Sequence, residues 1–168
     1  MAFKEIEIKD LNMNPFTLIS NEWLLITAGN ESKFNTMTAS WGSLGVFWGK
    51  NSATIYVRQS RYTKEFIDLN DTFSLSFFSE DYKKALGICG SLSGRDVNKV
   101  EKANLTPVFD EISPYFKEAK MTMICKKMYH TDIELANFDE PKFNETMYPD
   151  KDYHTIYIAE ILKVLVKE

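Results

Sequence analysis

A short stretch near position 40 combines small, hydroxyl-bearing and aromatic side chains in a way that suits a flat ligand. It reads Asn35-Thr-Met-Thr-Ala-Ser-Trp41 and continues into Gly42-Ser-Leu-Gly45. Small residues let backbone N–H and C=O groups approach a ligand edge, while hydroxyls can hydrogen-bond it and methionine or tryptophan can cover a ring face. We therefore predict a strand that runs into a glycine-containing turn at a ligand site. An edge strand with a bulge is the structural alternative.

Two further segments carry groups that bind anions. In Arg58-Gln-Ser-Arg-Tyr-Thr63, hydroxyls and guanidinium groups surround the start of a predicted helix. In Cys89-Gly-Ser-Leu-Ser-Gly-Arg-Asp-Val-Asn-Lys99, Gly94 permits a turn of backbone amides, and Arg95 and Lys99 supply positive charge. The start of a helix offers free N–H donors and a favourable dipole, so either segment could hold a phosphate. A capped helix with solvated basic side chains is the alternative for each.

Taken together and in this order, the three segments resemble the flavin reductase-like family of FMN-binding split barrels, especially its flavoredoxin-like branch. The similarity extends over nearly the whole chain, and the Ser93–Lys99 run is its most specific part. The family pattern ends in a histidine on the last strand, where this chain has His154 in Asp152-Tyr-His-Thr-Ile-Tyr-Ile-Ala-Glu160. The resemblance implies a mainly β fold with short helices, an antiparallel split β-barrel of the Greek-key type that binds FMN.

The resemblance also implies which residues contact FMN. Residues 37–40 would face the hydrogen-bonding edge of the ring, where contacts tune a flavin, and the two helix starts would hold the phosphate. His154 would be the catalytic candidate, as the one group placed in the site that titrates near physiological pH; an exposed histidine at a strand start is the alternative. The implied FMN contacts are Met37, Thr38, Ala39, Ser40, Trp41, Arg58, Ser60, Arg61, Tyr62, Thr63, Cys89, Gly90, Ser93, Gly94, Arg95, Asp96 and Lys99.

An NAD(P)H-dependent flavin oxidoreductase, which transfers hydride to flavin, is the activity that the resemblance implies, with NAD(P)H as the possible electron donor. The sequence has no Gly-x-Gly-x-x-Gly fingerprint, so a nicotinamide would dock onto the flavin face without a Rossmann domain. Two alternatives stay open: an FMN electron carrier with a redox protein partner, and a structural or binding barrel. The family builds its flavin sites near a subunit interface, which implies a homodimer. The aromatic segments Phe47-Trp48 and 138–148 are candidates for that interface.

The two cysteines and two histidines have no metal-ligand spacing, so we predict neither a metal site nor a disulfide. Cys125 lies in an alternating strand pattern and is expected to be a small core residue. The resemblance places Cys89 beside the cofactor, and a thiol packed at the end of a helix is the alternative for that residue.

Length and composition indicate one globular domain over residues 1–168, since 168 residues with 44% hydrophobic content can bury a sizeable core. The net charge of −4, with both signs interspersed, argues against nucleic-acid and membrane partners. No apolar run reaches the roughly 18 to 20 residues of a membrane span, and charges interrupt the N-terminus where a secretory signal needs its apolar core. We expect a cytoplasmic protein.

Periodicity predicts many strands and few helices. Because strands and helices do not alternate regularly, an antiparallel barrel is favoured over a doubly wound sheet. A long irregular connection is expected over residues 138–152, and Ser60 and Asp96 are expected to begin the first and third helices. The predicted strands are 16–19, 23–28, 34–41, 52–57, 72–78, 106–109, 115–134 and 154–166, and the predicted helices are 61–69, 80–89 and 96–104.

Overall fold

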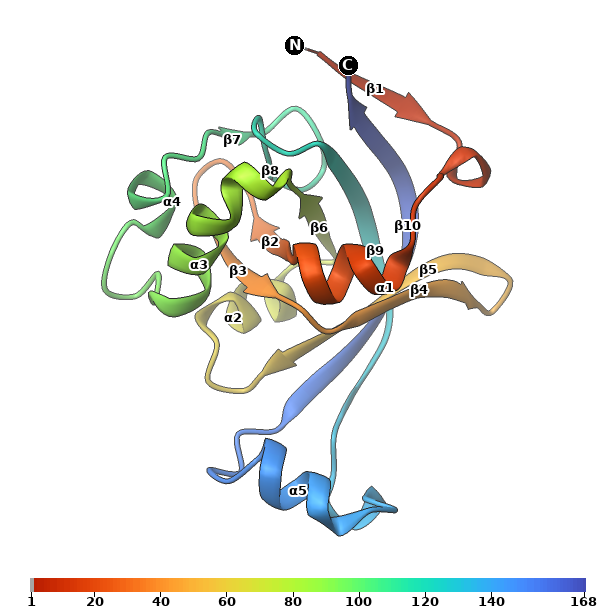
Figure 1. The fold of residues 1–168 in the computed structure, drawn as a ribbon, viewed down its shortest axis with the longest axis vertical. Helices are drawn as coiled ribbons and strands as arrows, with labels where there is room; N and C mark the ends of the chain where they lie inside the picture. Colours follow the sequence, from red (N-terminus) through yellow and green to blue (C-terminus); the bar gives the residue numbers. More distant parts are fainter. Residues whose placement is uncertain (1) are drawn as a thin grey trace.

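In the computed structural model, which describes residues 2–168, an eight-stranded antiparallel sheet forms the frame of the molecule (Figure 1). Hydrogen-bonded neighbours follow the order β3-β2-β6-β9-β10-β5-β4, and β1 pairs with the far end of β10. The mainly antiparallel β architecture predicted from the sequence is confirmed. The strands are β1 (Phe3–Ile6), β2 (Leu24–Gly29), β3 (Phe34–Ala39), β4 (Gly42–Phe47), β5 (Lys50–Arg58), β6 (Thr72–Phe77), β9 (Met121–Asp132) and β10 (His154–Lys167), with β7 (Pro107–Val108) and β8 (Tyr115–Phe116) as a separate pair.

Short helices cover the sheet and connect its strands. Figure 1 shows α2, α3 and α4 on one side of the barrel, and α5 standing away from it at the end of the long strands β9 and β10. The helices are α1 (Pro15–Thr17), α2 (Tyr62–Leu69), α3 (Lys83–Ser91), α4 (Lys99–Lys102) and α5 (Pro141–Met147), with a π-helical turn η2 (Leu18–Glu22) and 3₁₀ turns η1 (Ile8–Asp10), η3 (Glu80–Tyr82) and η4 (Leu135–Asn137). Within residues 2–168, no helix has the length and apolar character needed to cross a membrane.

The core lies on both faces of the sheet. Strand β5 alternates as a half-buried strand does, with Ala53, Ile55 and Val57 buried. Strand β6 departs from simple alternation, because Ser74 and Ser76 are as deeply buried as the aromatic residues between which they lie. Strand β6 lies inside the sheet, and each hydroxyl has a partner: Ser74 Oγ donates to the Pro114 carbonyl at 2.5 Å, and Ser76 Oγ lies 3.2 Å from Thr122 Oγ1. Buried serines are therefore tolerated because their hydrogen bonds are satisfied.

The strand predicted at residues 16–19 is wrong, because this segment is helical. Asn14 begins α1, and its Oδ1 accepts from the N–H groups of Phe16 at 3.0 Å and Thr17 at 3.4 Å. Pro15 follows at the first helical position, where its fixed φ favours a helix. The Asn-Pro pair was the missed signal, and it outweighs the short apolar run.

The turn predicted at residues 42–45 is also wrong, since these residues belong to β4, which pairs with β5. The reversal comes later, at Trp48 and Gly49, whose φ angles of 51° and 73° are both positive. Two consecutive positive φ values are typical of the tight turn that joins twisted antiparallel strands. Gly42 serves close packing in the strand, because a Cβ there would lie 3.0 Å from the Thr54 carbonyl oxygen.

The remaining corrections concern helix boundaries. Helix α4 is shorter than the predicted 96–104 and is capped by Asn98, whose Oδ1 accepts from Glu101 N–H at 3.2 Å, so Asp96 is not its start. Helix α2 begins after Arg61, and the Ser60 hydroxyl bonds elsewhere. Residues 138–152, predicted to be irregular, contain α5 with Pro141 at its first turn. The strand predicted over 115–134 is divided into β8 and β9, which belong to different sheets, and the other predicted strands and helices are present with shifted ends.

Candidate active site

The end of β3, the end of β5 and the start of β10 meet around a cavity of about 160 Å³, which we call the first cavity. Antiparallel pairing of β5 and β10 places Arg58 opposite His154. Side chains alternate across a strand, so Tyr56 shares the face of Arg58. The lining residues are Met37, Thr38, Ala39, Ser40, Trp41, Tyr56, Arg58, Arg61 and His154.

A second cavity of about 290 Å³ adjoins the first and shares Met37, Arg58 and Arg61 with it. Its walls come from the start of α2 and from the end of α3 with the turn that follows. The residues that line the second cavity alone are Ser60, Tyr62, Thr63, Ser91, Leu92, Ser93 and Lys99. The two cavities therefore bring together the three segments singled out in the sequence.

Arg61 lies at the junction of the two cavities. One of its terminal nitrogens donates to the Gly90 carbonyl at 2.7 Å, which fixes the guanidinium against the end of α3. Burial, together with the nearby charge of Arg58, lowers the pKa of Arg61 from its ordinary value of 12.5. Arginine remains protonated in proteins, so the junction carries a fixed positive charge.

Lys99 supplies a second cation, and it is deeply buried, with 4% of its surface exposed. Its ammonium donates to the carbonyls of Cys89 at 3.1 Å and Leu92 at 3.3 Å. An ammonium has three N–H donors, so one stays available for a ligand in the second cavity. Burial lowers the pKa of Lys99 to about 8, so the side chain is mainly charged at neutral pH.

The donors of Arg58 and Ser60 are turned toward the end of α5 and the segment that follows it. Arg58 donates to the carbonyls of Asp152 at 2.9 Å and Met147 at 3.1 Å. The Asp152 carboxylate accepts from Ser60 N–H at 3.0 Å and from Ser60 Oγ at 2.5 Å. These contacts fasten the connection between β9 and β10 to the edge of the site.

His154 lines the first cavity, yet it is nearly buried, with 7% of its surface exposed. Its Nδ1 lies 2.8 Å from the Tyr148 hydroxyl, and its ring lies 5.2 Å from the Trp41 ring. Burial, and then the charge of Arg58, lower the pKa of His154 to about 4. The expectation that this histidine titrates near physiological pH is wrong, because a buried imidazole beside a guanidinium stays neutral there.

The segment after α3 is divided between two cavities. Lys99 lines both the second cavity and a third cavity of about 460 Å³, and Ser93 faces the second. Gly94, Arg95 and Asp96 line only the third cavity, together with residues 31–35. The predicted role of these three residues as direct ligand contacts therefore finds no support in the lining of the first two cavities. Arg95 instead forms an ion pair with Glu65 at 2.5 Å and lies 4.6 Å from the Tyr62 ring centre.

A close neighbour of Gly94 explains why this position is a glycine. A Cβ on Gly94 would overlap Asn35 Oδ1 and come within 3.3 Å of the Tyr62 ring. Asn35 is itself held in place, because its Nδ2 donates to Thr63 Oγ1 at 2.8 Å. The glycine therefore allows the turn to pack against β3 and the start of α2.

Neither cysteine presents its thiol to the site. Cys89 is fully buried, and burial raises its pKa to about 11; only its carbonyl takes part, by accepting from Lys99. The packed-thiol alternative is thus confirmed, and Cys89 lines neither of the two cavities. Cys125 is buried in the main core, as predicted, and both thiols are free.

The model of the flavin reductase-like domain family matches residues 16–168 of the chain. The chain belongs to the flavin reductase-like family. This is an FMN-binding family, so the recognition of FMN-binding split barrels from three short segments is confirmed.

Solved structures confirm the fold of this flavin reductase-like protein. An FMN-binding domain of a flavin reductase-like enzyme from Shewanella baltica superposes with a TM-score of 0.70 at 18% identity, covering 98% of this chain and 77% of that one. The flavoredoxin of Desulfovibrio vulgaris gives 0.67 at 26% identity, with coverage of 87% and 69%. The flavoredoxin of Methanosarcina acetivorans gives 0.67 at 23% identity, with coverage of 88% and 69%. Among curated proteins, the comparison found no match.

The residues present fit the FMN that the family binds. One end of the adjoining cavities is cationic, through Arg61 and Lys99, as a phosphate requires. The other end offers the backbone and hydroxyls of residues 37–40 beside the Trp41 and Tyr56 rings. Among residues 2–168, the side chains that line these two cavities include no carboxylate.

Sequence reasoning missed several residues of this flavin reductase-like site. Tyr56 could have been found, because strand alternation puts it on the face of Arg58. Ser91 and Leu92 lie between two predicted site residues and could have been included by position. Tyr148 and Asp152 had no signal, because they come from an aperiodic connection whose path depends on tertiary contacts.

Proposed function

We propose that this flavin reductase-like protein binds FMN along the two adjoining cavities and acts as an NAD(P)H-dependent flavin oxidoreductase. The ring would lie in the first cavity and the phosphate in the second. The observation that carries the proposal is the polarity of the adjoining cavities, which run from the Trp41 and Tyr56 rings to Arg61 and the buried Lys99. An aromatic end followed by a cationic end matches a ligand with a flat ring at one end and a dianion at the other.

The protein side chains have separate tasks in this proposal. Arg61 and Lys99 hold the phosphate, and the start of α2 adds the unpaired N–H groups of a first helical turn. The backbone and hydroxyls of residues 38–40 orient the polar edge of the ring. Bound FMN supplies the hydride and electron chemistry.

His154 has a defined protonation state in this site. With its pKa lowered to about 4 by burial and Arg58, it is a neutral imidazole at physiological pH. It can therefore orient a ligand by hydrogen bonding without adding charge, while Arg58 and Arg61 provide the positive potential that favours an electron-rich ring. The Tyr148 hydroxyl at 2.8 Å fixes the ring of His154 through Nδ1.

Anaerobic mixing tests the oxidoreductase activity. If the protein is a reductase, NADH or NADPH should bleach the bound flavin in a rapid phase whose rate saturates with nicotinamide concentration. Absence of bleaching by either nicotinamide, with full bleaching by dithionite, would reject the reductase and retain the flavoprotein.

An FMN electron carrier is the second candidate function. The similarity to the Desulfovibrio flavoredoxin, at 26% identity over 87% of this chain, favours it. A carrier needs its ring near the surface, and Trp41 at the edge of the first cavity is 44% exposed. Such a protein would exchange electrons with a redox protein partner and would bleach only with that partner or with dithionite.

We also propose that the protein assembles as a homodimer. The supporting feature is the extension formed by the distal ends of β9 and β10 with α5, which stands away from the barrel (Figure 1). It carries half-exposed apolar side chains, including Phe143 at 45% and Met147 at 41%, and the β4–β5 turn exposes Trp48 at 67%. Tyr148 drops out of the predicted interface, because it packs inward against Phe138 and Tyr153. Light scattering of the purified protein tests the assembly.

A further inference from the structure

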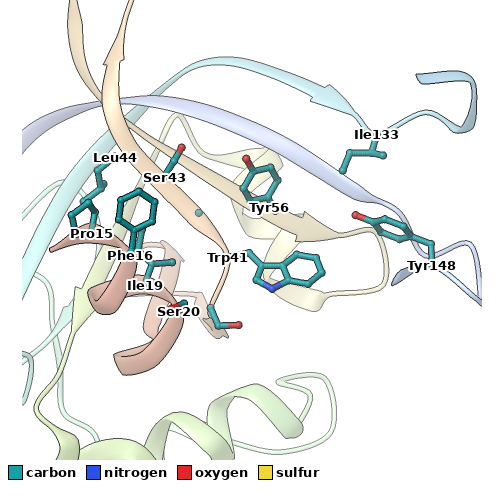
Figure 2. Close-up of a pocket in the computed structure, with 12 residues that line it drawn as sticks. Pro15, Phe16, Ile19, Ser20, Trp41, Ser43, Leu44, Tyr56, Ile133 and Tyr148 are labelled. Atoms are coloured by element: carbon teal, nitrogen blue, oxygen red, sulfur yellow. The ribbon is translucent and has the colours of Figure 1, made fainter. Parts of the chain in front are cut away.

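A cavity of about 510 Å³, here called the apolar cavity, opens beside the first cavity and shares Ser40, Trp41 and Tyr56 with it. Figure 2 shows the Trp41 and Tyr56 rings between the helical wall that carries Phe16 and the side chain of Tyr148. A molecule in the apolar cavity would therefore lie next to whatever occupies the first cavity. This position makes it a candidate second-substrate site.

Three parts of the chain build its walls. Helix α1 and the π turn contribute Pro15, Phe16 and Ile19, and β4 contributes Leu44. The connection between β9 and β10 closes the far side with Ile133 and Tyr148 (Figure 2). The walls are thus mainly aliphatic and aromatic, and apart from the shared Ser40, Trp41 and Tyr56 they come from elements outside the flavin-contacting segments.

The polar groups of the apolar cavity are neutral. They are the hydroxyls of serine and tyrosine side chains and the indole N–H of Trp41, and none of its lining residues within the described chain carries a charge. Burial raises the pKa of Tyr148, which keeps its hydroxyl protonated. The neighbouring first cavity, in contrast, contains Arg58 and Arg61. Burying an unpaired charge in apolar surroundings is costly, so the apolar cavity selects against charged ligands.

We infer that the apolar cavity binds an uncharged, planar aromatic compound as the second substrate of the flavin site. The assignment to a substrate rests on the proposed function; the binding itself rests only on the cavity. A volume of about 510 Å³ accommodates a bicyclic aromatic compound, and the aromatic walls offer stacking and edge contacts. The pyrophosphate of a dinucleotide finds no cation here, which separates this ligand class from NAD(P)H.

A pair of isosteric probes tests the inference. Naphthalene-2-carboxamide and naphthalene-2-carboxylate share the same bicyclic ring system and differ in charge. Titrated calorimetrically into the FMN-loaded protein at pH 7.5, the amide should bind, and the carboxylate should bind at least about tenfold more weakly because its charge is unpaired. Equal affinity of the two probes, or no binding of the amide, would overturn the inference.

Two matched variants of β4 locate the binding site. Ser43→Glu adds a charge to the wall of the apolar cavity at an exposed position, so it should lower the affinity for the amide probe by at least about tenfold. Val46→Glu adds the same charge to the same strand outside the cavity, at a residue that is 72% exposed, and should leave amide binding unchanged. Equal effects of the two variants would place the probe elsewhere and refute the site.

Two further measurements keep the inference separate from the proposed function. If Ser43→Glu alone converts a dimer to monomers in light scattering, the cavity is covered by a second copy of the chain and the inference fails. FMN affinity is measured on the same samples before the probes are added. Loss of amide binding with normal FMN binding rejects only the apolar site, whereas amide discrimination in a protein that binds no FMN rejects only the flavin function.

Discussion

Lys99 lies at the cationic end of the adjoining cavities, so raising the pH should weaken FMN binding. Burial lowers its pKa to about 8, and a basic group loses its charge as the pH rises through its pKa. About 90% of the side chains carry the charge at pH 7 and about 10% at pH 9, so FMN affinity should fall about tenfold if binding requires the ammonium. The FMN phosphate is not a competing cause, because its second pKa is about 6 and it stays a dianion over this range.

Fluorescence titrations of FMN at half-unit steps from pH 7 to pH 9.5 provide the assay. Riboflavin has the same ring without the phosphate, so its affinity should not follow the titration of Lys99. Lys99→Met should lower FMN affinity at pH 7 and remove the step near pH 8; its melting temperature must be checked, because the carbonyls of Cys89 and Leu92 lose their donor. A flat FMN profile in the unmodified protein, or the same step for riboflavin, would refute the assignment of Lys99 to the phosphate.

Three other predictions follow from the site. Arg61→Ala should lower FMN affinity by about ten- to a hundredfold, because one charge-assisted hydrogen bond contributes about 1.5 to 3 kcal/mol. Riboflavin affinity should stay nearly unchanged, and an equal loss for both ligands would mean that Arg61 supports the fold or the ring pocket. His154→Ala should slow flavin bleaching by nicotinamide more than it weakens FMN, and the unmodified protein should show no rate step from this residue between pH 5.5 and 8; an unchanged rate would remove His154 from the reaction. Gly94→Ala should lower the free energy of unfolding by about 1 to 3 kcal/mol, because the new Cβ displaces Asn35 from its buried hydrogen bond. Gly87→Ala is the control: a Cβ there meets nothing within 4 Å, so it should stabilise α3 by about 0.5 to 1 kcal/mol. Equal melting temperatures of the two variants would contradict the packing argument.

The strands were largely predictable because a half-buried strand repeats every second residue. This period located β5 and β10 and put Arg58 and His154 at strand ends, where the register then brings them together. The strand prediction for residues 16–19 was wrong because four residues are too few to distinguish a strand from a helix. The Asn14 cap decides for the helix. Local capping chemistry thus settled what periodicity could not.

The candidate site was predictable as three segments but not as a set of contacts. Lys99 could be placed near a phosphate by its motif, yet its pKa depends on burial that no local pattern records. The same holds for His154, whose neutral state arises from burial and from Arg58 on a different strand. Asp152 was missed because its contact with Ser60 joins residues 92 positions apart through an aperiodic connection.

FMN titration of the apoprotein tests the central claim most directly. We expect saturable quenching of flavin fluorescence with one FMN per chain, and a rise in unfolding free energy of about 2.7 kcal/mol when free FMN is at 100 times its dissociation constant. Riboflavin should bind more weakly than FMN, because it lacks the phosphate and its contacts. Neither quenching nor thermal stabilisation by excess FMN would contradict the assignment of the adjoining cavities to a flavin.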